Sequence, residues 1–261
     1  MEYGCDSSPL CLCDRRRVLS HWFEPIADHL GSAYLRYSFT RGTEQEVRFL
    51  VDAMGLQPGD RVLDVGCGPG RHAHALGRLG IEVVGVDIAE RFIALARQGA
   101  PTGVTFVRGD ARNLDFEGEF DAAISLCQGA FGLSGGPASA PDRLDPDLPV
   151  LQGMARAIRP GGRVAFSAFS AYFQVRYLEE TDEFDADRGV NRERTTVLDE
   201  QQNPLETELW TSCFTPRELR FLVAVAGLSL DAIFSVTPGR YAANPPDLDH
   251  PEFLVLASRP F

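Results

Sequence analysis

Three aspartates lie at the ends of successive apolar runs of the chain, and carboxylates in such positions can hold a nucleoside-like ligand. Asp64, Asp87 and Asp110 each end or follow a run that is typical of a buried strand. Asp87 follows Asp64 by about 20 residues, the spacing at which a strand-end acid accepts hydrogen bonds from ribose hydroxyls. We expect Asp64 to meet a cationic amine and Asp110 an exocyclic amine of a base.

A glycine-rich turn directly follows the first aspartate. Gly66, Gly68 and Gly70 stand at alternate positions and precede a predicted helix. Glycine permits a positive φ and a close ligand approach, and the N-terminus of a helix offers unpaired N–H groups. The dinucleotide pattern Gly-x-Gly-x-x-Gly is not met, because Arg71 stands where its third glycine would be, and no Gly-Lys-Ser/Thr follows. The turn therefore favours a nucleoside ligand that carries an amine over one that carries a pyrophosphate.

Together these features resemble the class I S-adenosylmethionine-dependent methyltransferases, of the type that modifies a nitrogen or oxygen of small molecules. The glycine-rich motif corresponds to residues 64–70, the ribose acid to Asp87 and the adenine-side pair to Asp110 and Ala111. The resemblance covers about residues 45–170 by motif and the C-terminal strands by pattern only. It implies S-adenosyl-L-methionine as cofactor, S-adenosyl-L-homocysteine as product and no metal. The cofactor-binding residues that it implies are Asp64, Gly66, Cys67, Gly68, Asp87, Ile88, Asp110, Ala111, Leu126 and Arg41.

The elements that must position these residues alternate along the chain. Near-continuous apolar strands between helices predict a parallel sheet that is covered on both faces, with its ligand at the carboxyl ends of the strands. The expected fold is α/β, a Rossmann-like doubly wound sheet of seven strands, mostly parallel with the last strand antiparallel. Strands are predicted at 61–65, 82–87, 104–109, 121–126, 163–169, 229–236 and 252–258. Helices are predicted at 71–79, 89–98 and 147–158.

The chain divides into four predicted parts. Residues 1–42 form a tail and a helical lid, and residues 43–169 form the cofactor-binding core. Residues 170–214 are a substrate-lid insertion after the fifth strand, with a hairpin of strands 190–198 and 205–214, and residues 215–261 complete the core. Two capping boxes are expected to begin helices, one at 43–46 and one at 215–218.

The sequence indicates the methyl acceptor less clearly than it indicates the cofactor. The fourth strand is followed by Ser-Leu-Cys-Gln-Gly-Ala-Phe-Gly, without the Asp/Asn-Pro-Pro-aromatic motif of adenine and glutamine methylation, the Pro-Cys of cytosine enzymes or the carboxylates of metal-dependent catechol enzymes. A small metabolite remains, methylated on nitrogen or oxygen. The residues expected to line its pocket are Gln128, Phe131, Tyr37, Tyr172 and Tyr241. His21 is the expected catalytic base, with Tyr34 and His250 among its rivals.

The charge and the cysteine content of the chain limit which kinds of partner it can have. The 261 residues carry a formal net charge of −12, which disfavours nucleic acid as a partner. The six cysteines form no disulfide framework, and Cys5, Cys11 and Cys13 lack the spacing of a zinc site. We expect a cytoplasmic protein that does not bind a membrane, with a small-molecule acceptor and a homodimer as an open alternative to a monomer.

Two other functions stay open at this stage. The first is a non-methylating S-adenosylmethionine-binding protein, either a cyclase or a sensor. The second is a nicotinamide-dependent oxidoreductase, against which Asp64 and the early third glycine argue.

Overall fold

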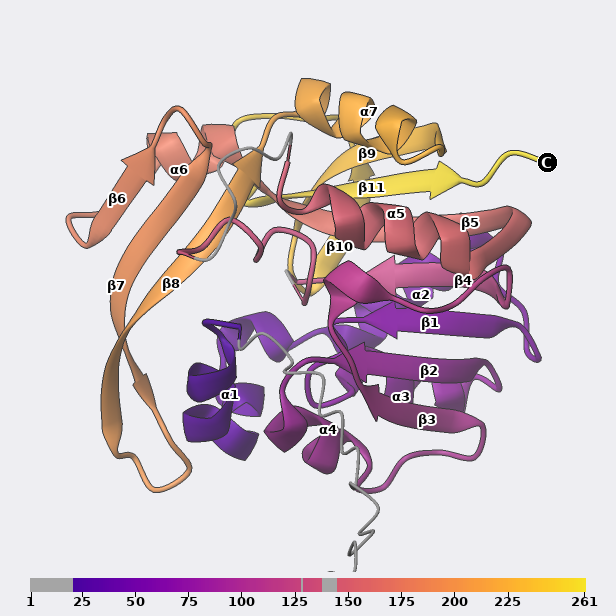
Figure 1. Ribbon diagram of the computed structural model, residues 1–261, viewed down its shortest axis with the longest axis horizontal. Coiled ribbons are helices and arrows are strands. Elements are labelled where there is room, and N and C mark those ends of the chain that lie inside the picture. Colours follow the sequence, from indigo (N-terminus) through magenta and orange to yellow (C-terminus); the bar gives the residue numbers. More distant parts are fainter. Residues whose placement is uncertain (1–20, 128, 138–144) are drawn as a thin grey trace, which may run out of the picture.

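The computed structural model describes residues 21–127, 129–137 and 145–261 (Figure 1). Its main sheet has the strand order β10-β9-β11-β5-β4-β1-β2-β3. Strands β1 to β5 run parallel, and β11 lies antiparallel between β5 and β9. The strands of this sheet are β1 (Arg61–Val65), β2 (Glu82–Asp87), β3 (Val104–Arg108), β4 (Phe120–Ser125), β5 (Ile158–Ser170), β9 (Ser229–Thr237), β10 (Arg240–Asn244) and β11 (Glu252–Ser258).

This arrangement confirms the predicted Rossmann-like class with a mostly parallel sheet and an antiparallel last strand. The strand count differs, because residues 240–244, between the two last predicted strands, form β10 and pair with β9. The order of strands reverses its direction between β1 and β4, since β2 and β3 extend one way and β4 and β5 the other. In such sheets ligands bind at the carboxyl edge beside this reversal.

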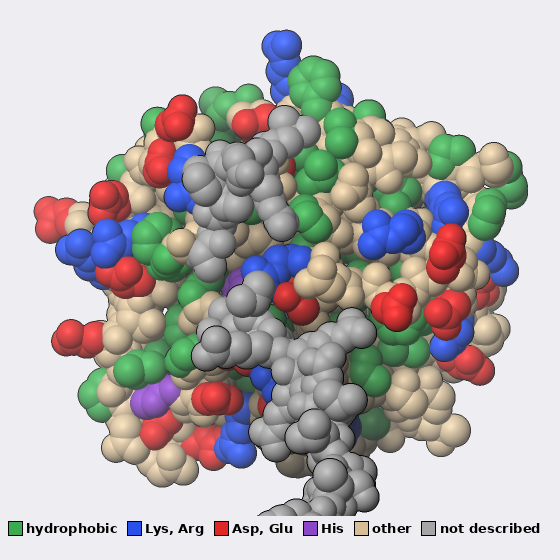
Figure 2. Space-filling model, in the orientation of Figure 1, with side chains coloured by type: hydrophobic (Ala, Val, Ile, Leu, Met, Phe, Trp, Pro, Cys, Tyr) green, Lys and Arg blue, Asp and Glu red, His purple; other side chains and the backbone are tan. Residues whose placement is uncertain are grey.

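Helices cover both faces of the sheet. Residues of α2, α3 and α4 pack on one face, and residues of α5 and α7 pack on the other. The helices are α2 (Thr43–Met54), α3 (Arg71–Arg78), α4 (Glu90–Ala96), α5 (Leu148–Ala157) and α7 (Pro216–Val225), with a short 3-10 turn, η3 (Ala111–Asn113), after β3. The surface in Figure 2 mixes acidic and basic side chains with hydrophobic ones. Across the described ranges, no helix is long and apolar enough to cross a membrane.

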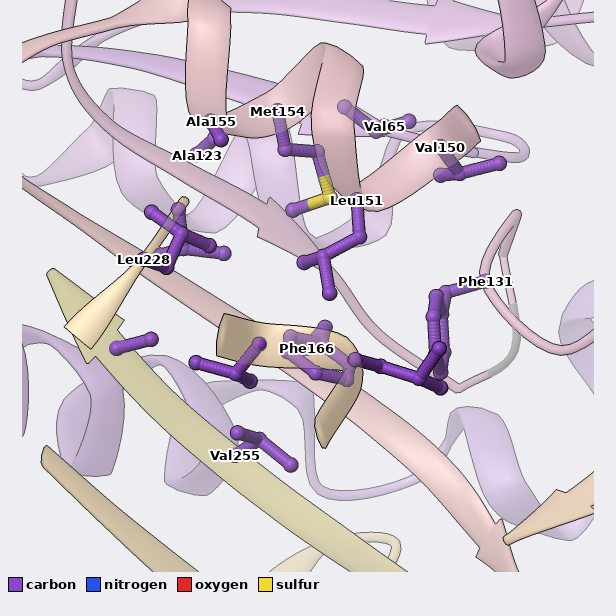
Figure 3. Packing of buried hydrophobic residues seen from close by; sticks show 14 of the residues in the cluster. Val65, Ala123, Phe131, Val150, Leu151, Met154, Ala155, Phe166, Leu228 and Val255 are labelled. Carbon is purple, nitrogen blue, oxygen red and sulfur yellow. The ribbon is translucent and has the colours of Figure 1, made fainter. Parts of the chain in front are cut away.

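The core between the sheet and α5 is closely packed (Figure 3). Leu151 of α5 points toward Phe166 of β5, and both lie with Met154, Val65 and Val255 in one cluster of fully buried side chains. Burying a side chain of this size contributes about 1.5–3 kcal/mol, so this packing fixes α5 and the strand ends firmly.

Two segments project over the carboxyl edge of the sheet. The N-terminal helices are α1 (Glu24–Leu30), η1 (Gly31–Arg36) and η2 (Ser38–Thr40). The hairpin lid is built from α6 (Ala171–Arg176), β6 (Asp182–Asp185), β7 (Val190–Leu198) and β8 (Pro204–Phe214), and it extends past α1 (Figure 1). The predicted hairpin is therefore present, and α6 and β6 are additions to it.

The tip of the hairpin lid docks on the N-terminal helices. Glu200 Oε1 accepts hydrogen bonds from the Ser32 backbone N–H at 2.8 Å and from Arg91 Nη2 at 3.1 Å. His29 Nε2 lies 3.0 Å from the Asn203 carbonyl oxygen. Below these contacts, Ile26 and Leu30 pack against Val197 of β7, so the hairpin and the helices form one cover.

The two predicted capping boxes have different outcomes. Thr215 and Glu218 form the expected box at the start of α7. At α2 the prediction is wrong, because the N-cap is Gly42 and no side chain caps the helix. Glu46, the expected box partner of Thr43, is fully buried and bonds other groups. That alternative partner set is the reason that the box does not form.

Candidate functional site

The glycine turn and Asp87 form one hydrogen-bonded unit at the carboxyl edge. The Gly68 N–H donates to Asp87 Oδ2 at 2.8 Å, and the Ala89 N–H donates to Oδ1 at 2.8 Å. Each carboxylate oxygen keeps a second acceptor site, so the group can still accept two hydroxyls. Burial raises the pKa of Asp87 to about 6, against the opposing effect of these backbone donors. The carboxylate is thus held in place and ready to accept two neighbouring hydroxyl groups.

Gly66 allows the segment after β4 to lie directly on the turn. Its φ is +73°, and a Cβ there would stand 2.0 Å from the carbonyl carbon of Gly129. No other residue fits this position, because any side chain would overlap the Gly129 backbone. The side chain of Cys67 is buried against β2 beside Gly85. Only the backbone of Cys67 is therefore in a position to contact a ligand.

Asp64 is buried at the end of β1 with part of its hydrogen-bonding capacity unused. Its side chain is 1% exposed, and Oδ2 has no hydrogen-bond partner among the described residues. Burial raises the pKa of Asp64 to about 7, with Arg71 opposing and Asp87 adding to the shift. A buried carboxylate oxygen without a partner is costly. An added cationic amine would relieve that cost, which fits the group expected there.

The ends of β2 and β3 border a narrow cavity of about 40 Å³. Four of the predicted cofactor-binding residues, Asp87, Ile88, Asp110 and Ala111, line this cavity together. Asp110 accepts three hydrogen bonds from the Arg112 side chain, of 2.7 Å, 2.9 Å and 3.2 Å. Burial opposes ionisation of Asp110, but these hydrogen bonds hold its pKa below the usual value. A base that enters the cavity meets this ion pair and not a lone carboxylate.

His21 lies at the same end of the site. It lines the cavity together with Asp110 and Arg112. Burial and the Arg112 charge lower the pKa of His21, so its ring is neutral at pH 7. His21 therefore stands beside Asp110, and it shares the cavity with Gly129, Ala130, Leu133 and Ser134 of the segment that follows β4. A base must be within hydrogen-bond reach of the acceptor, and the role of His21 as that base stays a prediction.

Arg71 stands at the centre of a buried polar network that sequence reasoning missed. Its Nη1 donates to Glu46 Oε2 at 2.6 Å, and its Nη2 lies 2.7 Å from Cys127 Sγ. Glu46 Oε2 also lies 2.8 Å from His72 Nε2. Burial and the Arg71 charge lower the pKa of His72, so the neutral ring donates from Nε2. Burial opposes ionisation of Glu46, yet its bonds to His72 and Arg71 lower its pKa to about 2.

This network also bears on the expected absence of a metal. Glu46, His72 and Cys127 offer ligand atoms within 4.8 Å of one another. The Arg71 guanidinium contacts two of these three side chains and supplies the positive charge between them. A divalent ion at that point would have to displace it. Cys127, like the other described cysteines Cys67 and Cys213, is a free thiol, and the predicted tail cysteines lie outside the described residues.

Three of the predicted tyrosines are at least partly buried near the site, whereas Arg41 lies on the surface. Tyr34 covers the glycine turn, with its ring 3.9 Å from where a Cβ of Gly68 would stand, and Tyr241 is buried with only 3% of its surface exposed. Tyr37 stacks on Phe39 under the hairpin lid. Arg41 is exposed, so the cation that lies beside the turn is Arg71.

Three pocket predictions have other outcomes. Phe131 is fully buried in the core, between Phe166 and Phe214 at ring distances of 4.6 Å and 4.9 Å, and so it anchors the segment after β4 and does not face a pocket. Tyr172 is exposed at the outer end of the hairpin lid, beside a separate open cavity of about 820 Å³. Gln128 lies outside the described residues.

Asp147 holds the segment that follows β4 in place through three hydrogen bonds. Its Oδ1 accepts the backbone N–H groups of Gly132 and Ser134, both at 2.9 Å, and its Oδ2 accepts the Ser212 hydroxyl at 2.7 Å. The carboxylate is fully buried and therefore depends on these donors. It ties the segment after β4 to β8 of the hairpin lid. No periodicity in the sequence marks this acid, since its role depends on three separate parts of the chain.

Comparison with known proteins fits this geometry. Residues 62–162 match a family model described as a methyltransferase domain. These residues are therefore similar to a methyltransferase domain. The matched range includes the three strand-end acids and the glycine turn, and a solved S-adenosylmethionine-dependent methyltransferase of Clostridium acetobutylicum shares the fold with a TM-score of 0.64 and 15% identity, over 92% of this chain and 98% of that one.

Individual relatives differ in how much they share. The chain is 36% identical over 124 residues to a demethylmenaquinone methyltransferase of Beutenbergia cavernae, covering 47% of this chain and 46% of that protein. It is 28% identical over 220 residues to a cypemycin N-terminal methyltransferase of Streptomyces, covering 77% and 84%. The solved CcbJ methyltransferase of Streptomyces caelestis shares the fold with a TM-score of 0.70 and 19% identity, over 92% of this chain and 96% of that one. The chain spans about half the length of the first curated relatives that it matches.

Proposed function

We propose that this protein transfers a methyl group from S-adenosylmethionine to a nitrogen or oxygen of a small metabolite. The observation that carries the proposal is the buried acid pair Asp64 and Asp87 around the glycine turn, at the carboxyl edge of the sheet. One acid keeps a buried oxygen without a partner among the described residues, and the other can accept two hydroxyls. A ligand with an amine and a ribose satisfies both.

Each cofactor-binding residue has a proposed task. Asp87 accepts the ribose hydroxyls, and Asp64 accepts the amino group. Ile88 packs against the base, while Asp110 and Ala111 meet its polar edge, and His21 covers this end. The backbones of Gly66, Cys67 and Gly68 surround the amino-acid part of the cofactor, and Leu126, directly after β4, supports it. Arg71 replaces Arg41 as the group that faces its carboxylate.

The protein's contribution to catalysis is positioning and desolvation. S-adenosylmethionine supplies an electrophilic methyl group on a sulfonium, which needs no proton on its leaving group. Near-linear alignment of the acceptor in a dry site can then supply most of the rate. The hairpin lid and α1 cover the edge, and Tyr34, Tyr241 and the Cys127 segment enclose it. The cypemycin N-terminal methyltransferase, a relative over most of its length, supports nitrogen as one acceptor atom.

The test follows the fate of a labelled methyl group. The protein is incubated with S-adenosylmethionine labelled with ¹³C in the methyl group and with a filtered metabolite extract, and the products are read by ¹³C NMR. We expect new N-methyl or O-methyl signals in the small-molecule fraction, which Asp87→Ala removes. Signals in the polymer fraction, or C-methyl signals alone, contradict the proposal. Binding of the cofactor without any labelled product on any fraction indicates the non-methylating alternative. A homodimer and a cytoplasmic location remain predictions.

A further inference from the structure

The Arg71 guanidinium spans the point at which the strand order reverses. Arg71 is the first residue of α3, directly after the glycine turn, and its Nη2 donates to Cys127 Sγ at 2.7 Å. Cys127 follows β4, which lies beside β1 with Ile124 in register with Asp64. The guanidinium therefore bridges the turn after β1 and the segment after β4, at the edge where ligands of such sheets bind.

Part of the hydrogen-bonding capacity of Arg71 is unused. A guanidinium carries five N–H groups. Among the residues that the structure describes, Nη1 donates to Thr43 Oγ1 at 2.8 Å and to Glu46 Oε2 at 2.6 Å, and Nη2 makes its single contact with Cys127. The Nε group and one N–H of Nη2 have no acceptor there, although the side chain is only 10% exposed. Two such donors on a buried cation favour an anionic ligand, and a carboxylate suits the fork of a guanidinium.

Glu46 holds this guanidinium from a fully buried position on α2. Its Oε2 accepts from Arg71 and lies 2.8 Å from His72 Nε2, while its Oε1 accepts the Gly239 N–H at 2.7 Å. Gly239 connects β9 to β10, and a Cβ on Gly42 would stand 2.4 Å from its Cα, so the start of α2 lies directly against that connection. Both oxygens of Glu46 are therefore fixed, one by α3 and the other by the β9–β10 turn.

Glu46 can act on a ligand of Arg71 in two opposite ways. A long side chain that is bonded in this manner has lost its rotational freedom before the ligand arrives, and such preorganisation raises affinity. The negative charge of Glu46 also competes with an anionic ligand for the same cation. The geometry favours the first effect, because Glu46 occupies Nη1 and leaves donors on Nε and Nη2 for a ligand.

We propose that Glu46 is a positioning residue, which fixes the Arg71 guanidinium so that its Nε and Nη2 groups bind the carboxylate of the cofactor's amino-acid part. This inference rests on the proposed methyl transfer and concerns how the methyl donor is held. Asp64 lies at the other end of the glycine turn, as the proposed partner of the cofactor's amine. The zwitterionic end of the cofactor thus meets one acid and one guanidinium, and Glu46 acts on it only through Arg71.

The test compares two ligands that differ in the carboxylate alone. S-adenosylhomocysteine and its decarboxylated analogue, in which a hydrogen replaces the carboxylate, are titrated into the protein by calorimetry. We expect S-adenosylhomocysteine to bind at least about 10-fold tighter to the wild-type protein, since charge-assisted hydrogen bonds are worth that factor. Glu46→Gln should lower this ratio of affinities about 3-fold, and Arg71→Gln should bring it near one. With Arg71→Gln present, Glu46→Gln should change the ratio no further. Glu44→Gln, in an exposed pair on the same helix, should leave it unchanged.

Three results would overturn the inference. A ratio that rises in Glu46→Gln shows that Glu46 competes with the ligand, and an equal loss of affinity for both ligands shows a structural role alone. Equal binding of both ligands to the wild-type protein shows that Arg71 does not bind the carboxylate, and it leaves the proposed function standing.

A milder variant keeps the test decisive if Glu46→Gln does not fold. Thr43→Val removes the other acceptor of Arg71 Nη1 and should lower the ratio about 2-fold, and an unchanged ratio would then overturn the inference. If the wild-type protein binds neither ligand, the proposed function itself fails.

Discussion

Asp64 illustrates how a single buried carboxylate can favour ligand binding and oppose folding. Its pKa is about 7 in the folded chain and 3.8 in an ordinary setting, so the folded state binds its proton more tightly. Stability is therefore highest below pH 3.8 with respect to this group, and it falls as the pH rises toward 7. A cationic ligand offsets the cost of burying the ionised Asp64 carboxylate, because it pairs with that charge.

Asp64→Asn separates these two effects. The variant keeps an acceptor and loses the charge, so at pH 8 the free energy of unfolding without ligand should rise by roughly 1–3 kcal/mol. S-adenosylhomocysteine affinity should fall by about 10-fold or more. Urea unfolding and calorimetry measure the two quantities on the same sample. A variant that is less stable and binds equally well would contradict both parts of the argument.

The pKa of Glu46 is shifted in the opposite direction to that of Asp64, and so its effect on stability has the opposite pH dependence. Its pKa is about 2 in the folded chain and 4.5 in an ordinary setting. Its stabilising contribution is therefore fully present above pH 4.5 and is lost as the pH falls through about 2. Glu46→Gln should lower the free energy of unfolding at pH 7 by roughly 3 kcal/mol, because it breaks a buried ion pair with Arg71.

The chain offers a matched control for Glu46 on the same helix. Glu44 pairs with Arg78 at 2.6 Å, and both side chains are more than half exposed. Glu44→Gln should change the free energy of unfolding by about 0–0.5 kcal/mol. Equal losses for the two variants, measured by urea unfolding at pH 7, would show that burial of the Glu46 pair is not what stabilises it.

The residues that sequence reasoning found and missed differ in a physical way. Asp87, Ile88, Asp110 and Ala111 line one cavity, because each ends or follows a strand and the edge of a parallel sheet collects such residues. That they bind a cofactor stays a prediction. The contact of Glu46 with Arg71 depends on how α2 packs against α3, which no local spacing encodes. From the sequence alone, the pattern from Thr43 to Glu46 fits a capping box as well as it fits the observed contact of Glu46 with Arg71.

At the scale of elements, the hairpin lid and the N-terminal helices act as one cover over the edge. Their joint is Glu200, which accepts from the Ser32 N–H and from Arg91. Glu200→Ala should loosen this joint and raise deuterium uptake in residues 24–40 and 190–214, with little change in the sheet. Glu206→Ala, an exposed acid on the same hairpin, is the control. Equal uptake in both variants would mean that Glu200 does not hold the cover.

The hairpin was predictable because two strand-like runs flank a turn, whereas β10 was not. Residues 240–244 contain few β-branched side chains, and they form a strand because β9 offers an edge to pair with. The segment is then held to α2 by Gln45. Pairing with a distant strand thus outweighs local propensity there.

At the scale of the whole molecule, the cover must move when a nucleoside enters. The cavity at the ends of β2 and β3 measures about 40 Å³, close to the volume of one water molecule in the liquid. Trp22 Nε1 donates to the carbonyl oxygen of Leu133, which lines this cavity, at 3.0 Å. Binding therefore requires displacement of the N-terminal helices or of the segment after β4. Hydrogen exchange should slow in residues 21–40 and 126–136 when ligand is added, and unchanged exchange there would contradict this motion.

The central claim is that the strand-end acids bind S-adenosylmethionine, and titration with S-adenosylhomocysteine by calorimetry tests it most directly. We expect one ligand per chain, an affinity that rises with pH through about 6–7 as Asp87 and Asp64 ionise, and a loss of roughly 2–4 kcal/mol in folded Asp87→Ala. An unchanged dissociation constant in that variant, or binding of NADH in place of S-adenosylhomocysteine, would contradict the account.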